Sequence, residues 1–219
     1  MTATTIFYMI FSRFEPFQAT GKKSDIMKTK FRLAGRGGQG IKFAGSFLAK
    51  AAMKAQYHTT LTVDYTPSVR GGPIFCDIVI SSEPISYPFC DHDANVLLML
   101  DQEVAQRAGE GVCHKTACFV DAHTVTDPEK FITRGLLLRC PFSKRADEHG
   151  MAATVNILSL GWLSKYIRQR AAGGELPAIE DNHYVKVIES MPEHFRKTNS
   201  RAFQLGKLLY DEAPATLHN

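Results

Sequence analysis

The feature that most constrains the fold of this chain is a glycine-rich stretch between a predicted strand and a predicted helix. Residues 33–40 read LAGRGGQG. The residues before them, 30–34, have the composition of a short strand. Residues 41–55 are rich in alanine and carry apolar side chains at helical spacing. A strand, a glycine turn and a helix in this order predict the opening unit of an α/β domain.

Three of these glycines, Gly35, Gly37 and Gly40, satisfy the pattern G-x-G-x-x-G. Glycine allows a tight turn and a close approach to a phosphate, and the following helix offers free N–H groups and partial positive charge. The acidic partner of a ribose hydroxyl would be Asp64, at the end of the next predicted strand. Because the residues around Asp64 do not continue a strand–helix–strand unit, three uses stay open: dinucleotide binding, an edge of another cofactor site, and close packing alone.

The rest of the chain alternates between short apolar runs and helical patterns. Strands are predicted over 61–65, 74–81, 95–100, 117–121 and 136–139, and helices over 101–109, 151–169, 183–190 and 193–210. No crossover helix separates the strands at 61–65 and 74–81, so the sheet is predicted to be mixed. We therefore predict a three-layer α/β/α domain with a mixed, Rossmann-like sheet and C-terminal helices. Residues 1–26 are predicted to be an N-terminal extension and residues 27–219 the domain.

Composition excludes several classes of function. The net charge of +4 is well short of the footprint of a nucleic-acid-binding protein. The five cysteines form no CxxC pair, which argues against an iron–sulfur or disulfide framework and favours small buried side chains. The apolar run at 6–11 is shorter than the ~20 residues that a bilayer requires and follows no basic segment, so a cytoplasmic location is expected. The histidines are scattered and no catalytic set or metal site is evident.

A second loop, residues 68–73, contains Arg70, Gly71 and Gly72. A guanidinium presented by a bent loop suits phosphate or carboxylate recognition, although the same residues could form a plain solvated turn. Asn156, in an otherwise apolar helical segment, is expected to satisfy a backbone group. Asp101, directly after a predicted strand, is expected to cap the next helix.

Taken together, these segments resemble the gamma subunit (domain III) of the 2-oxoacid:ferredoxin oxidoreductases, which act on pyruvate, ketoisovalerate (2-oxoisovalerate), 2-oxoglutarate, indolepyruvate or phenylglyoxylate. The resemblance rests on GRGGQGI, on the Arg70–Gly72 loop, on NVLLMLDQ, on the A-x₃-G-x₅-N-x₄-G pattern at 146–161 and on the segment 195–206. It covers residues 28–206. Pro73 departs from the family pattern, in which a small residue is commoner.

The resemblance implies a subunit that is inactive alone. The family's complexes oxidatively decarboxylate a 2-oxoacid with coenzyme A, giving an acyl-CoA, CO₂ and low-potential electrons. Thiamine diphosphate with Mg²⁺ and the [4Fe-4S] clusters are implied to lie on alpha, beta and ferredoxin-like partner subunits, and coenzyme A is implied to pass the edge of this one. No nucleic-acid or membrane partner is expected. The residues expected at the cofactor-facing edge are Gly35, Arg36, Gly37, Gly38, Gln39, Gly40, Arg70, Gly71 and Gly72.

Two other interpretations remain open at this point. One is a subunit of an oxidoreductase that binds NAD or FAD through the glycine loop, with Asp64 on the ribose. The other is a structural partner whose glycine loops only permit close packing against a neighbouring subunit.

Overall fold

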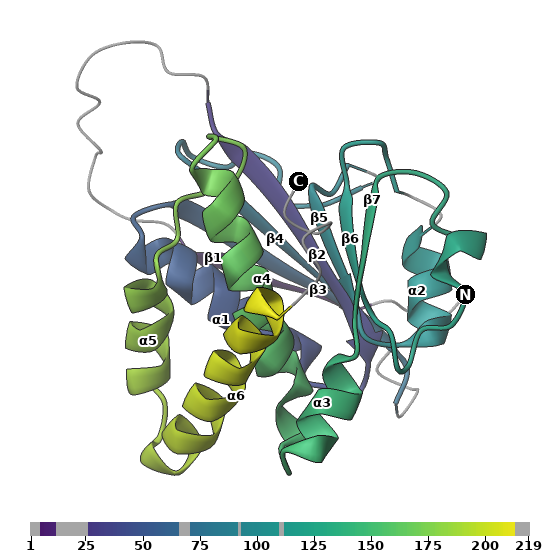
Figure 1. Cartoon of the computed structure of the whole chain (residues 1–219). Coiled ribbons are helices and arrows are strands. Elements are labelled where there is room, and N and C mark those ends of the chain that lie inside the picture. Colours follow the sequence, from purple (N-terminus) through teal and green to yellow (C-terminus); the bar gives the residue numbers. More distant parts are fainter. Residues whose placement is uncertain (1–4, 12–25, 66–70, 92, 110–111, 213–219) are drawn as a thin grey trace.

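The computed structural model describes residues 5–11, 26–65, 71–91, 93–109 and 112–212. They form a seven-stranded sheet with helices on both faces (Figure 1). The strands are β1 (Thr5–Phe11), β2 (Lys28–Arg36), β3 (His58–Tyr65), β4 (Pro73–Ser81), β5 (Val96–Met99), β6 (Ala117–Asp121) and β7 (Leu136–Cys140). Their order across the sheet is β1-β3-β4-β2-β5-β6-β7.

The central strand β2 joins two halves of opposite character. On one side, β2, β5, β6 and β7 are parallel; on the other, β4 is antiparallel to β2 and to β3, and β3 is antiparallel to β1. The predicted mixed sheet is confirmed, because β3 and β4 follow each other without a crossover helix. The segment predicted as an extension contributes β1, which pairs with β3 at one edge of the sheet. The division into an extension and a domain stays a prediction.

The helices are α1 (Ile41–Lys54), α2 (Gln102–Gly109), α3 (Phe142–Glu148), α4 (Val155–Ala171), α5 (Asp181–Glu189) and α6 (Glu193–Asp211), with short 3₁₀ helices η1 (Pro128–Lys130) and η2 (Ala152–Thr154). The helix predicted over 151–169 is α4, which begins at Val155 because η2 occupies the residues before it. One face of the sheet packs against α1 and α4, which are in turn contacted by α3, α5 and α6, and the other face packs against α2 (Figure 1). The three-layer arrangement with C-terminal helices is confirmed.

Alternation along β2 explains the two layers. Phe31 and Leu33 point into the larger core under α1 and α4, whereas Ala34 belongs to the smaller core under α2. Arg32 occupies the same face as Ala34, where a charged side chain breaks the apolar pattern. The face of β2, β3 and β4 beside α2 is therefore partly polar.

The backbones of two helices come into contact where α4 crosses α6. Gly161 of α4 lies against the backbone carbonyl of Phe203, and Gly206 of α6 lies against the carbonyl of Leu158. A Cβ atom at either glycine would collide with the facing carbonyl oxygen. These two glycines allow the helix backbones to touch, which packs α6 tightly onto the larger core.

Candidate functional site

The glycine loop forms a tight turn at the carboxyl end of β2. Gly38 and Gly40 have φ angles of 98° and 70°, in the left-handed region that favours glycine. At Gly35 a Cβ atom would lie 2.6 Å from the Cδ1 atom of Ile41, the first residue of α1. The backbone angles at Gly38 and Gly40 and the close contact at Gly35 therefore explain why glycine occupies these three positions.

The side chain of Gln39 fixes the shape of this loop. Its Oε1 accepts a hydrogen bond from the N–H of Arg36 at 2.7 Å, and its Nε2 donates to the carbonyl of Leu100 at 3.0 Å. Leu100 follows β5 directly, so Gln39 ties the turn to the neighbouring parallel strand. The two hydrogen bonds of the Gln39 side chain thus stabilise the loop without using the backbone of Gly37 and Gly38.

The two glycine loops of the sequence meet in the structure. The N–H of Gly37 donates to the carbonyl of Gly72 at 2.9 Å, and a Cβ atom at Gly37 would lie only 3.1 Å from the Cα atom of Gly71. The Nε of Arg36 also donates to the carbonyl of Gly71, at 3.0 Å. Residues 35–40 and 71–72 therefore form one continuous edge, which we call the glycine edge. Arg70, predicted at the same place, lies outside the described residues.

Positive charge on the glycine edge is partly shared with α2. Arg36 pairs with Glu103 in the first turn of that helix, with 3.2 Å between Nη2 and Oε2. Both side chains are largely exposed, so the pair is worth little to stability and is easily exchanged for a ligand. Arg36 is thus a cation that a bound anion could recruit from Glu103.

Asn156 supports the glycine edge from behind. Its Nδ2 donates to the carbonyl of Gly40 at 3.1 Å, and its side chain fills the space that a Cβ atom at position 40 would need. The expectation that Asn156 satisfies a backbone group is confirmed. Asp101 caps α2 as expected, since its Oδ1 accepts from the N–H groups of Glu103 and Val104 at 3.1 and 3.3 Å.

A groove next to Gly40 is lined by a mixture of apolar and polar side chains. Its volume is about 570 Å³. Phe43 on α1 and Phe195 on α6 border it, and both are among the large apolar side chains that stay exposed. Exposed aromatic rings beside a concave surface are typical of a protein interface. The groove extends the glycine edge toward α6.

The structure does not bring Asp64 to the glycine loop. In the sheet, β4 lies between β3 and β2, and Asp64 pairs with Phe75, which pairs with Ala34 on its other side. Two strand spacings, about 10 Å, therefore separate Asp64 from β2. A dinucleotide site of this kind would need the carboxylate of Asp64 near the glycine loop, and the structure does not place it there. The geometry therefore does not support the NAD or FAD interpretation.

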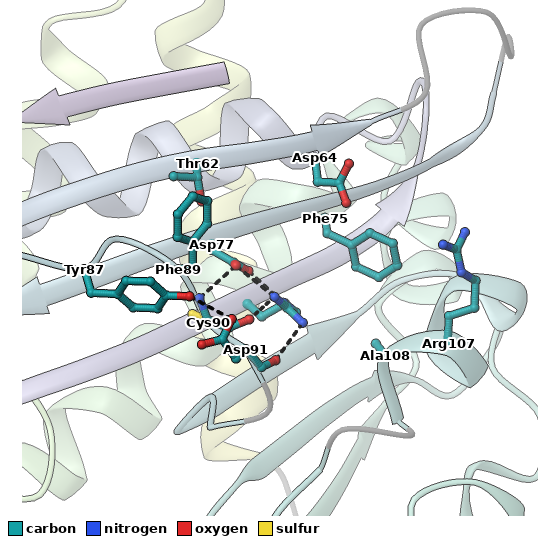
Figure 2. Close-up of a pocket in the computed structure, with 11 residues that line it drawn as sticks. Thr62, Asp64, Phe75, Asp77, Tyr87, Phe89, Cys90, Asp91, Arg107 and Ala108 are labelled. Atoms are coloured by element: carbon teal, nitrogen blue, oxygen red, sulfur yellow. Dashed lines mark hydrogen bonds and ion pairs between the residues drawn. The ribbon is translucent and has the colours of Figure 1, made fainter. Parts of the chain in front are cut away.

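A cavity of about 450 Å³ lies on the α2 side of β2, β3 and β4, where the sequence patterns predict no site (Figure 2). At its floor, Arg32 and Asp77 form a bidentate ion pair, with 2.7 Å between Nε and Oδ1 and 2.8 Å between Nη2 and Oδ2. Asp77 also accepts from the N–H of Cys90 at 2.9 Å, and Arg32 donates to the carbonyls of Cys90 and Asp91. The pair therefore pins the segment after β4 against the sheet.

Burial shapes the protonation of this cavity. Burial opposes the charge on Arg32, but the hydrogen bonds and charge of Asp77 outweigh it, so the pKa of Arg32 is raised. Burial also disfavours the charged form of Cys90. It therefore raises the pKa of the Cys90 thiol, which is neutral at physiological pH. At the mouth, partial desolvation raises the pKa of Asp64, and the nearby Arg107 counteracts it.

Of the five cysteines, four are buried, as predicted: Cys76, Cys90, Cys118 and Cys140; Cys113 is half-buried. Within the described residues, no three histidine, cysteine or acidic side chains gather as a metal ion would require. None of the helices in the described part of the chain has the length and apolar character needed to cross a membrane.

Comparison with known proteins identifies the family to which this fold belongs. The family model of pyruvate ferredoxin/flavodoxin oxidoreductases matches residues 30–208. The chain belongs to this family. The resemblance found in the sequence is confirmed.

Individual relatives and solved structures are also similar to this chain. The chain is 29% identical over 185 residues to the 2-oxoglutarate synthase subunit KorC of Methanocaldococcus jannaschii, covering 82% of this chain and 92% of that one. It is similar in fold to the gamma subunit of the keto/oxoacid ferredoxin oxidoreductase from Geobacter sulfurreducens, with a TM-score of 0.64 and 22% identity, over 85% and 98% of the two chains.

The same fold also occurs inside a longer chain. In the 2-oxoglutarate:ferredoxin oxidoreductase from Magnetococcus marinus, whose structure holds 2-oxoglutarate, coenzyme A and succinyl-CoA, the match has a TM-score of 0.73 and 22% identity. It covers 85% of this chain and 32% of the Magnetococcus chain. The present chain thus spans about a third of that relative.

Proposed function

We propose that this chain is the gamma subunit of a cytoplasmic, thiamine diphosphate-dependent 2-oxoacid:acceptor oxidoreductase. The complex would oxidatively decarboxylate a 2-oxoacid with coenzyme A, giving an acyl-CoA, CO₂ and low-potential electrons. Family membership and the similarity to a 2-oxoglutarate synthase subunit support this reaction class. The chain would be inactive alone and would assemble with alpha, beta and ferredoxin-like subunits.

The observation that carries the proposal is the hydrogen bond from the N–H of Gly37 to the carbonyl of Gly72. It joins the loop at 35–40 and the residues 71–72 into one surface. Apart from each glycine and its two chain neighbours, no heavy atom of the described residues lies within 4 Å of the positions that Cβ atoms would take at Gly38 and Gly71. Backbone at these two glycines is open to close approach by a partner subunit or by a cofactor that the partner holds. The glycine edge would form one wall of the passage to thiamine diphosphate.

The surroundings of the glycine edge fit both a partner subunit and coenzyme A. The exposed rings of Phe43 and Phe195 offer apolar area for a partner. Arg36 and the first turn of α1 offer positive charge, which attracts the phosphates of coenzyme A. Arg70 would add a second guanidinium. The metal and cluster chemistry would be supplied by the partner subunits, as the resemblance to the family implies.

Replacing Gly37 with alanine tests the glycine edge. The new Cβ atom would press on Gly71 and displace the two loops by a few tenths of an ångström. In the complex assembled with its partner subunits, we expect the apparent KM for coenzyme A to rise about fivefold, the effect of roughly 1 kcal/mol of lost interaction, with the KM for the 2-oxoacid unchanged. Steady-state kinetics with each substrate varied in turn would measure both constants.

The matched control is Gly173→Ala, because Gly173 lies in the turn after α4 and a Cβ atom there would make only ordinary contacts. Arg70→Ala is expected to act in the same direction as Gly37→Ala. An unchanged KM for coenzyme A in both variants would contradict the proposed passage. Loss of co-purification with the partner subunits would instead assign the glycine edge to packing alone.

A further inference from the structure

The cavity on the α2 side of the sheet has the size of a ligand site and is separate from the glycine edge. Its volume of about 450 Å³ lies within the ~300–1,000 Å³ common for small-molecule sites. Strands β2, β3 and β4 form its floor, α2 borders one side, and the segment around Tyr87–Asp91 borders the other (Figure 2). The proposed passage to thiamine diphosphate uses none of the residues that line it.

Two polar groups on the floor have unused hydrogen-bonding capacity. The side chain of Thr62 is buried, and among the described residues its hydroxyl has no hydrogen-bond partner. Arg32 uses four of the five N–H groups of a guanidinium, leaving one hydrogen on Nη1 without a partner in the described part of the chain. A hydroxyl and an N–H group at the floor of a cavity favour a ligand with polar acceptor atoms at its inner edge.

Aromatic rings form the walls of this cavity. Phe75 of β4 and Phe89 stand on opposite sides of the floor in Figure 2, and both are half-buried. Such rings bind planar ligands by stacking. The walls therefore favour a flat ring above the Arg32–Asp77 pair.

The mouth carries one cation and one anion that do not pair directly. The guanidinium of Arg107 stacks over the ring of Phe75, 5.4 Å from its centre, and no carboxylate among the described residues lies within ion-pair distance of it. Figure 2 shows Arg107 and Asp64 on either side of Phe75, each exposed. A ligand seated here meets a donor for an anion and an acceptor for a hydroxyl or amine.

We propose that this cavity binds an adenosine phosphate. The adenine ring would stack between Phe75 and Phe89, and its edge nitrogens would accept from Thr62 and Arg32. Ribose hydroxyls would donate to Asp64, and a phosphate would bind Arg107 with charge-assisted hydrogen bonds. An aromatic amino acid could stack on Phe75 and Phe89 and pair its charges with Arg107 and Asp64. It would leave the donors of Thr62 and Arg32 without acceptors, so the nucleotide fits better.

The adenosine phosphate could come from two sources: a free adenine nucleotide, or the nucleotide end of coenzyme A. Only the second source rests on the proposed function. Isothermal titration of the purified full chain with ADP, and separately with coenzyme A, distinguishes them. Binding of ADP assigns the site to nucleotides in general. Binding of coenzyme A without ADP assigns the cavity to the coenzyme only if the cavity variants below weaken it, because the glycine edge is proposed to meet coenzyme A as well.

Arg107→Gln should weaken ADP or coenzyme A binding about tenfold or more, because a charge-assisted hydrogen bond to phosphate is lost. Phe75→Leu should weaken it by a similar factor through lost stacking. Lys50→Gln is the matched control, since it removes one positive charge from an exposed position on α1, at the opposite face of the sheet. Its affinity should be unchanged.

The proposal is overturned if neither ADP nor coenzyme A binds, or if both cavity variants bind as tightly as the unmodified chain. Because the titration needs neither partner subunits nor turnover, it can fail while the coenzyme A dependence of the assembled complex still responds to Gly37→Ala. The two proposals are thus separable. Far-ultraviolet circular dichroism of each variant shows that the fold is retained.

Discussion

Replacing Gly206 with alanine should lower the melting temperature of this chain by about 6 °C. The added Cβ atom would strike the carbonyl oxygen of Leu158 in α4, and a backbone oxygen cannot rotate away as a side chain can. Overpacking of this kind costs about 3 kcal/mol, whereas alanine gains only about 1 kcal/mol over glycine in a helix. The clash therefore outweighs the helix propensity, and each kcal/mol shifts the melting temperature of a chain this size by about 2–4 °C.

Thermal unfolding followed by circular dichroism measures this effect. Gly173→Ala provides the control, because it makes the same chemical change where the nearest atom would be 3.6 Å away, and its melting temperature should stay within about 1 °C. Gly161→Ala should resemble Gly206→Ala, since it meets the carbonyl of Phe203 across the same helix crossing. Equal melting temperatures for Gly206→Ala and the control would show that α4 and α6 are not in backbone contact.

Asp77→Ala is expected to cost about 3 kcal/mol in the free energy of unfolding, because it leaves the Arg32 guanidinium without its counter-ion. The side chain of Asp77 is only 8% exposed and that of Arg32 24%, so water replaces the lost carboxylate poorly. The N–H of Cys90 would also lose its acceptor. Urea denaturation of the variant and the unmodified chain gives the difference directly.

The double variant Arg32→Met with Asp77→Leu separates the charge from the packing. Replacing both partners of a buried ion pair by apolar side chains of similar volume is often close to neutral, so most of the lost stability should return. If the single and double variants were equally unstable, the loss would come from packing around β2 and β4. If Asp77→Ala were as stable as the unmodified chain, the ion pair would not anchor the segment after β4.

Much of the fold could be predicted because its signals are local. Apolar runs over 74–81 and 117–121, and helical spacing over 41–55, correspond closely to β4, β6 and α1. The pairing of β1 with β3 could not be predicted in this way, since residues 5–11 carry an apolar run but nothing in it names a partner strand. Strand order depends on contacts between residues far apart in the chain.

The candidate sites also differ in how far they could be predicted from the sequence. The glycines of the first loop were evident, because left-handed backbone and close approach restrict the residue type at each position. Asn156 could be predicted to bind a backbone group, but its partner, Gly40, is 116 positions away. The cavity was missed because Thr62, Phe75 and Arg107 come from three separate elements and form no pattern within any of them.

The central position of β2 has a consequence for the assembly of this chain with a partner. Gly37 at its end is bound to the residue before β4, and Gln39 to the residue after β5, so the loop touches both halves of the sheet. In the folded sheet, β2 is hydrogen-bonded to β4 of the β3–β4 hairpin on one side and to β5 on the other. The glycine edge therefore has its shape only when both halves of the sheet are joined at β2, so a partner that binds the edge selects folded chains for assembly.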